Sequence, residues 1–144
     1  MPGTRRSRAR CLASARCLAT VGLLLLTGAG IEQPLEGLQG DPVRGEKVVI
    51  RQASTCTLCH AGPFPNPHLQ GNVGPDLLGV GARLSLPELR ERLVDASRMN
   101  PATVMPSFFR TEGLTRVGAA WRGKPILSAQ EIEDAVAYLA TLKQ

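Results

Sequence analysis

The segment Cys56-Thr57-Leu58-Cys59-His60 decides the fold of this 144-residue chain. It has the pattern C-x-x-C-H, in which two thiols three positions apart can reach the two vinyl groups of one haem and form thioether bonds. The adjacent His60 then turns under the iron as its proximal ligand. The motif therefore predicts one covalently attached c-type haem, with Cys56 and Cys59 as attachment residues and His60 as an iron ligand.

Two other kinds of site use cysteines at this spacing. A thiol–disulfide redox pair is typical of a strand–helix–strand context, and no such pattern follows Cys59. A zinc site needs a second pair of ligands, but His68 is the only other histidine in the chain. Both alternatives agree less well with the sequence than haem attachment does.

The sixth position on the iron has three candidate ligands, which are His68, Met99 and Met105. His68 lies in a short proline-rich loop soon after His60, and such a loop is poorly suited to reach the opposite face of a haem. Met105 precedes Pro106, which prevents a helix from running through it, so an extended loop can present its sulfur to the iron. Met99 is more typical of haem-wall or core packing. We expect Met105 to be the ligand, with Met99, His68 or an open position as the alternatives.

The first 30 residues have the features of an export signal. Arg5 to Arg16 form a positively charged stretch, residues 17–26 are apolar, and residues 27–30 are small enough for cleavage. The apolar stretch is too short to span a bilayer of about 30 Å as a helix. We therefore expect export to the periplasm and removal of residues 1–30, which leaves residues 31–144 as one domain with no stable membrane anchor. An uncleaved N-terminal anchor is the alternative.

The formal net charge of +5 arises in this same N-terminal segment. It holds five of the 17 Lys and Arg residues and no acid, so 12 basic and 12 acidic residues remain in 31–144. A neutral domain has no electrostatic footprint for nucleic acid, and we expect no such partner. The chain is also only 3% aromatic, and a bound apolar cofactor would supply interior volume that aromatic side chains usually fill.

The domain is predicted to be all-α, with three or more short helices and long loops wrapped around the haem. Three capping signals each predict a helix start: Asp41-Pro42 for a helix to about Ala53, and the S-x-x-E patterns at Ser85 and Ser128 for helices to about Ala96 and about Leu142. Residues 61–84 and 97–127 have few periodic apolar positions, so we expect loops there. No alternating strand pattern of useful length occurs.

The order of these features resembles the class I cytochrome c fold over essentially all of residues 31–144. The segment Gly74-Pro75-Asp76-Leu77 matches the part of that family whose proline carbonyl accepts the N–H of the proximal histidine. The resemblance implies that Pro75 orients the ring of His60 and raises its basicity. It also implies that Leu77 packs on the haem.

Three longer segments resemble the SoxX family, the small monohaem cytochrome subunits of the SoxAX complexes of sulfur-oxidising bacteria. They are GNVGPDLLGVGARLS (71–85), NPATVMPSFFRTEGLTRV (100–117) and RGKPILSAQEIEDAVAYLATLK (122–143). The resemblance implies that the iron has His/Met ligation, with Met105 as the methionine. It also implies a heterodimer with a SoxA-type cytochrome subunit.

The same resemblance implies a function. The chain would accept electrons from the oxidative coupling of thiosulfate to a carrier-protein cysteine and would pass them to a downstream cytochrome. It would be a subunit of an L-cysteine S-thiosulfotransferase-type complex, and the catalytic site is expected in the SoxA partner. No residue of this chain marks a thiosulfate pocket of its own.

Two other functions stay open. A free periplasmic shuttle cytochrome would have a lysine-rich haem edge, but residues 31–144 contain only Lys47, Lys124 and Lys143. A haem sensor or small-ligand enzyme needs an open sixth position on the iron. The position of Met105 in the sequence argues against such an open position.

Residues 110–124 carry four basic side chains and only one acid, Glu112. This charge is typical of a solvated face, and it would also suit a docking surface for a partner. Phe108, Phe109 and Trp121 lie in or beside this segment. They are candidates for core packing, for a wall of the haem site or for a partner interface.

Overall fold

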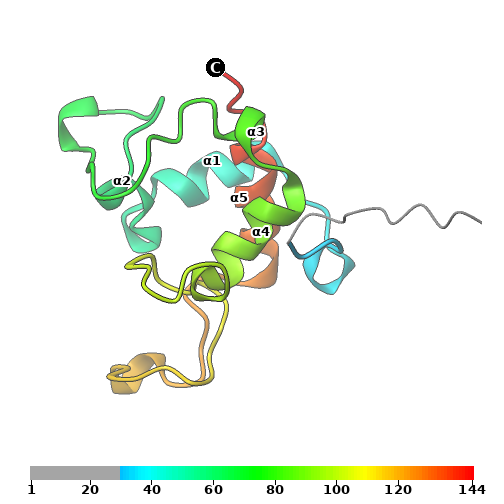
Figure 1. Ribbon diagram of the computed structural model, residues 1–144, viewed down its shortest axis with the longest axis vertical. Coiled ribbons are helices and arrows are strands. Elements are labelled where there is room, and N and C mark those ends of the chain that lie inside the picture. Colours follow the sequence, from blue (N-terminus) through cyan, green and yellow to red (C-terminus); the bar gives the residue numbers. More distant parts are fainter. Residues whose placement is uncertain (1–29) are drawn as a thin grey trace, which may run out of the picture.

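The computed structural model describes residues 30–144 (Figure 1). The predicted export signal therefore lies outside the described residues, apart from Gly30. Within residues 30–144 the chain forms helices and no strand, in the order η1 (Leu35–Gly37), α1 (Pro42–Ile50), η2 (Gln52–Ser54), α2 (Cys56–Cys59), η3 (Pro67–Leu69), α3 (Val80–Arg83), α4 (Leu86–Asp95), η4 (Ala96–Arg98), η5 (Ala119–Trp121) and α5 (Ala129–Leu139). None of the helices in this part of the chain is long and apolar enough to cross a membrane.

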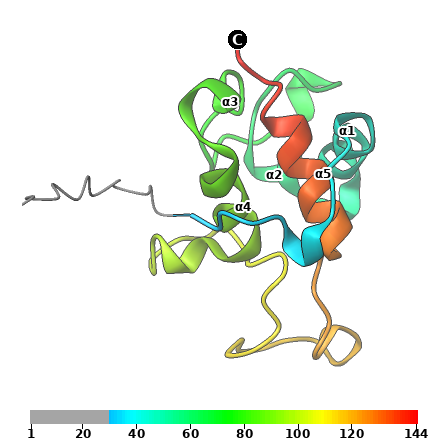
Figure 2. The same cartoon turned by 90° about the vertical axis from the view of Figure 1, so that its right-hand side faces the viewer.

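Helix α5 lies between α1 and α4 and contacts both of them (Figure 2). At the contact with α1, a Cβ at Gly45 would meet the backbone carbonyl of Asp134 and the Cβ of Tyr138. A residue without a side chain is therefore needed for the two backbones to approach this closely. The contact buries Val49 and Ile132 almost completely, so the α1–α5 crossing forms the centre of the apolar core.

The predicted starts of the three main helices are confirmed. Asp41 caps α1 by accepting the backbone N–H of Arg44 at 2.9 Å. Ser85 and Ser128 form complete capping boxes at the starts of α4 and α5. These side chains satisfy N–H groups that a helix start leaves unpaired, which is why the signals are readable from sequence alone.

The end of α1 differs from the expectation. The helix ends at Ile50 rather than near Ala53, because Arg51 has an extended backbone. The fully buried Ser54 then turns its hydroxyl toward the carbonyls of Val48 and Arg51. A buried carbonyl at a helix end needs a donor, and Ser54 supplies it.

The region from 61 to 84 is less irregular than expected, and α5 is shorter. The one-turn helix α3 occupies residues 80–83 in the expected loop. Its Gly81 N–H donates to the carbonyl of Leu142 at 2.8 Å. The chain leaves the α-helix after Leu139 rather than near Leu142 and joins α3 by this bond.

A buried ion pair joins α4 to α5. The side chains of Arg90 and Glu133 are only 4% and 3% exposed, and the guanidinium donates to both carboxylate oxygens at 2.7 and 2.9 Å. Arg90 also donates to the carbonyl of Ile31, and Glu133 accepts the N–H of Leu35. The pair therefore fastens the segment before α1 to both helices, with its charges fully hydrogen-bonded.

We expect Gly45→Ala to lower the free energy of unfolding by on the order of 2–3 kcal/mol, because the added methyl group overpacks a backbone contact. The matched control is Gly118→Ala, where a Cβ would meet nothing within 4 Å. Denaturant unfolding of the two haem-loaded variants, followed by circular dichroism, measures the difference. Equal midpoints for both variants would contradict the close α1–α5 packing.

Candidate haem site

A cavity of about 690 Å³ brings the sequence-predicted site residues together. Its volume lies in the range of about 300–1,000 Å³ that is typical of cofactor sites. Its walls include Cys56, Cys59, His60, Pro75, Leu77 and Met105. Apolar side chains such as Val49, Leu93 and Leu139 line it from α1, α4 and α5, so the cavity is set into the core. His68 is exposed on η3 and does not line this cavity.

The two cysteines lie on the one-turn helix α2, at the wall of the cavity. Both are half-buried free thiols. The Cys56 thiol donates weakly to the carbonyl of Ser54 at 3.7 Å. Burial raises the pKa of the Cys56 thiol, in spite of that bond, so it is a neutral thiol at neutral pH. One helical turn thus presents two thiols to the same apolar space.

Residues 71–77 fold back onto the motif and carry Pro75 to His60. Three backbone hydrogen bonds pin this loop: Gly71 N–H to the Thr57 carbonyl at 2.9 Å, Gly74 to Cys59 at 2.7 Å, and Leu77 to Ala61 at 2.8 Å. The Nδ1 atom of His60 lies 2.6 Å from the Pro75 carbonyl oxygen. Because a carbonyl only accepts, Nδ1 carries the proton and donates it, which leaves Nε2 as the atom that can bind a metal.

The two candidate methionines differ in their surroundings, although both line the cavity. Met105 is half-buried and packs against the apolar core. Met99 is 37% exposed, and its sulfur lies 3.4 Å from Nη1 of Arg92. The core contact of Met105 holds its side chain more firmly beside the cavity than the exposed position of Met99 does.

Asp95, the last residue of α4, anchors the segment that carries Met105. Its carboxylate is nearly buried, accepts the Ser107 hydroxyl at 2.6 Å and pairs with Arg110 at 3.1 Å. Burial works to raise the pKa of Asp95, but hydrogen bonds from Ser107 and Ser97 and the charge of Arg110 outweigh it and hold the pKa below its ordinary value. Asp95 is therefore charged at neutral pH and ties the residues that follow Pro106, Ser107 and Arg110, to the end of α4.

Sequence reasoning missed Asp95. A carboxylate at the C-terminal end of a helix opposes the helix dipole, so it needs local donors to be stable there. The signal that could have identified Asp95 is an acid at the end of a predicted helix, with a serine and an arginine later in the chain.

The wall also contains two arginines, Arg83 and Arg92. The guanidinium of Arg83 donates to the carbonyls of Leu78 and Asp76 at 2.6 and 2.7 Å, so neither bond neutralises its charge. Arg92 is half-buried and has a long contact of 3.4 Å with the carbonyl of Glu88. The wall also contains one acid, Asp76, so the cavity is mostly apolar with two positive charges and one negative charge at its wall.

These residues fit a c-type haem, which the fold implies. The haem is an apolar macrocycle with two vinyl groups and two carboxylates, and the cavity offers apolar walls, two thiols and two cations. An imidazole with a free Nε2 and a thioether sulfur are the donors that haem iron takes in cytochromes c. Within residues 30–144, no cluster of three or more His, Cys, Asp or Glu side chains could hold a metal ion by itself.

Comparison with solved structures identifies the fold as that of the class I cytochromes c. The crystal structure of SoxXA from P. pantotrophus contains a chain with 35% sequence identity and a TM-score of 0.72. The match covers 80% of this chain and 90% of that one. This chain therefore belongs to the SoxX family. No protein-family model matches the chain, and no curated protein matches it.

We expect Gly74→Ala to disrupt the histidine side of the site, because a Cβ at Gly74 would lie only 2.6 Å from Nδ1 and 2.8 Å from Nε2 of the His60 ring. The ring would have to move away from the Pro75 carbonyl. The visible and electron paramagnetic resonance spectra of the purified holoprotein measure this, with loss of the low-spin signal as the expected result. Gly118→Ala is the control and should keep the spectrum of the unsubstituted protein.

Proposed function

We propose that this chain is the electron-transfer subunit of a SoxAX-type complex. The observation that carries the proposal is one cavity lined by both the C-x-x-C-H motif and Met105, in a chain 35% identical to part of SoxXA. The free shuttle cytochrome is less favoured, because no lysine lines the cavity. The sensor alternative is less favoured, because Met105 packs beside the cavity rather than away from it.

The proposed site holds a single haem c. Cys56 and Cys59 would hold it by thioether bonds, and His60 and Met105 would bind its iron. When bound, the haem supplies a one-electron centre. The chain's own residues set its surroundings: Pro75 fixes the proton on Nδ1 of His60, and the apolar walls exclude water.

The proposed reaction takes place at the SoxA partner. A carrier-protein cysteine thiol and thiosulfate form one sulfur–sulfur bond, and one proton and two electrons are released. This chain would take the electrons one at a time and pass each to a downstream cytochrome. Because the bond-forming step belongs to the partner, no catalytic residue is assigned to this chain.

The proposed location is the periplasm, after removal of residues 1–30. The sequence of residues 1–30 supports this, because a basic stretch, an apolar stretch too short to span a bilayer and a run of small residues follow one another there. The signal itself falls on residues that the structure does not describe, apart from Gly30.

We expect Met105→Ala to lower the reduction potential of the holoprotein, because a thioether ligand stabilises ferrous over ferric iron relative to nitrogen ligands or water. The same change should open a position for added carbon monoxide. Met99→Leu should do neither, because leucine preserves the packing volume at the cavity wall. Spectroelectrochemical titration and carbon monoxide difference spectra measure both effects. The reverse pattern would assign the sixth position to Met99.

We expect the haem of the purified chain to be reduced only when the SoxA-type subunit, thiosulfate and the carrier protein are all present. The reason for this dependence is that no residue of the sequence marks a thiosulfate site. Stopped-flow absorbance at the ferrous bands measures reduction, with each component omitted in turn. Direct reduction of the isolated chain by thiosulfate at a similar rate would contradict the proposed division of roles.

A further inference from the structure

Residues 111–125, which we call the basic loop, project from the body of the domain. Figures 1 and 2 both show this loop, which carries η5, extending away at the end opposite the C-terminus. Its base is closed by the N–H of Leu127, which donates to the carbonyl of Phe108 at 2.9 Å. Phe108 is buried in the core, so the base is fixed while the loop itself stands clear.

The basic loop has few polar ties to the rest of the described fold. Its hydrogen bonds are internal, from Trp121 N–H to Gly118 at 2.9 Å and from Lys124 N–H to Trp121 at 3.1 Å. Within residues 30–144, no hydrogen bond or ion pair joins residues 111–125 to the rest of the chain. Almost all of its residues are exposed. Its side chains are therefore free to meet another molecule.

The backbone of the loop is nevertheless sharply shaped. Gly113, Arg116 and Gly123 have φ values of 66°, 59° and 67°. The left-handed region suits glycine but is unfavourable for arginine by about 1–2 kcal/mol. A turn at Arg116 that no contact with the body requires is consistent with a loop whose shape serves recognition.

The loop combines an exposed aromatic ring with concentrated positive charge. Trp121 is 55% exposed. The loop contains three basic residues, Arg116, Arg122 and Lys124, and one acid, Glu112. By contrast, residues 31–144 as a whole are formally neutral. Tryptophan and arginine are the residues most enriched among the anchors of protein interfaces. Such a surface fits a partner with an acidic face and an apolar pocket.

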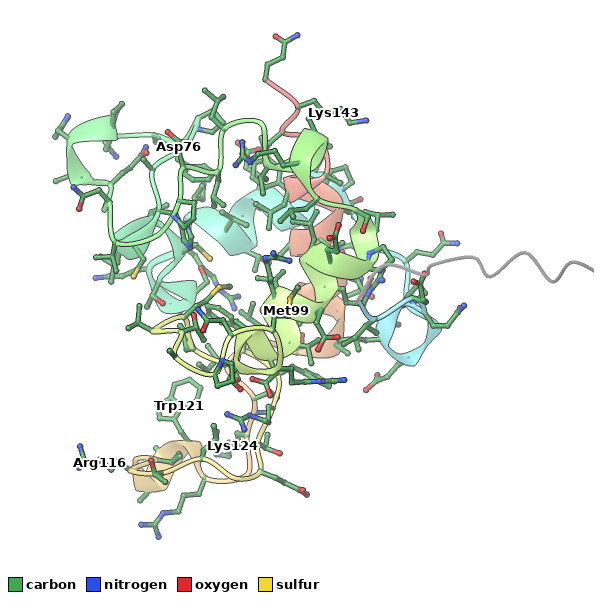
Figure 3. All side chains as sticks on the ribbon, in the orientation of Figure 1. Asp76, Met99, Arg116, Trp121, Lys124 and Lys143 are labelled. Atoms are coloured by element: carbon green, nitrogen blue, oxygen red, sulfur yellow. The ribbon has the colours of Figure 1, made fainter. Side chains whose placement is uncertain are left out.

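The loop is joined directly to one wall of the haem cavity. The segment from Thr103 to Pro106 lines the cavity, as does Phe108 at the base of the loop. Figure 3 shows Trp121 on the side of the loop that faces the segment around Met99, while Lys143 lies at the far end of the domain. A partner bound to the loop would therefore sit beside the methionine side of the cavity.

We propose that the basic loop is the docking element for the SoxA-type subunit, through Trp121 in an apolar pocket and Arg116, Arg122 and Lys124 against acidic residues. This inference rests on the proposed function, because that function names the partner. It assigns the interface to one loop and gives the partner's complementary chemistry. The loop then has the role of bringing the partner's redox centre next to the cavity wall.

The test is the affinity of the holoprotein for the purified SoxA-type subunit of the same organism, measured by isothermal titration calorimetry at several salt concentrations. Trp121→Ala is expected to weaken binding about tenfold or more, as buried aromatic anchors do. Lys124→Glu is expected to weaken it and to flatten the salt dependence, because the opposite charge meets the acidic face.

Two matched variants locate the effect. Lys143→Glu makes the same charge change at the far end of the domain, and Val43→Ala removes another exposed apolar side chain, which is 64% exposed on α1. Both are expected to bind as the unsubstituted chain does, and all four variants should keep its visible spectrum and unfolding midpoint, since none lies in the core.

Equal affinities for Trp121→Ala and the unsubstituted chain, or equal losses for Lys124→Glu and Lys143→Glu, would overturn the docking role and leave the heterodimer standing. No binding by the unsubstituted chain would overturn the proposed function and this inference together.

Discussion

The fold depends on filling one apolar cavity at its centre. Apolar side chains from three helices line this cavity of about 690 Å³. Contact of apolar surface with water costs about 25 cal/mol for each Å² that stays exposed, and an apolar group that covers the surface removes that cost. The residues of α1, α4 and α5 that line the space therefore need an apolar occupant to form a stable core.

The residues that would hold this occupant lie on two sides of the cavity. On one side, a single turn of helix carries Cys56 and Cys59. The loop that follows folds back, and the carbonyl of its Pro75 accepts a hydrogen bond from the His60 ring. On the other side, Asp95 fixes the segment that carries Met105. Each of these contacts fixes one residue of the site, as the proposed redox function requires of a site that keeps one geometry in two oxidation states. Within residues 30–144, the basic loop makes no hydrogen bond or ion pair with the residues of this framework.

The sequence was sufficient for those features that rest on local chemistry. The capping residues at Asp41, Ser85 and Ser128 each work within a few positions, and the structure confirms them. The C-x-x-C-H spacing is equally local, and haem attachment through it stays a prediction. The all-α architecture followed from the same signals, and the 35% identity with a SoxXA chain agrees with it. The assignment of Met105 over Met99 is still a prediction, which the reduction potentials of the two variants decide.

What the sequence could not supply depends on contacts between distant segments. The end of α1 is set by Ser54, which bonds back to the helix, and the end of α5 by the bond between Gly81 and Leu142. The sequence did not identify Arg90 as a core residue, and it is buried because Glu133 meets it from α5. The composition of the basic loop likewise does not predict that it projects from the domain. The same basic residues would suit an ordinary solvated face as well as a projecting loop.

The measurement that tests the central claim most directly is the intact mass of the exported protein after denaturation, acid–acetone extraction and thiol labelling. A covalent haem at the centre of the fold predicts a single species with the mass of the polypeptide plus one haem and no label on Cys56 or Cys59. A polypeptide that loses its haem on extraction and takes up label at both cysteines would contradict it.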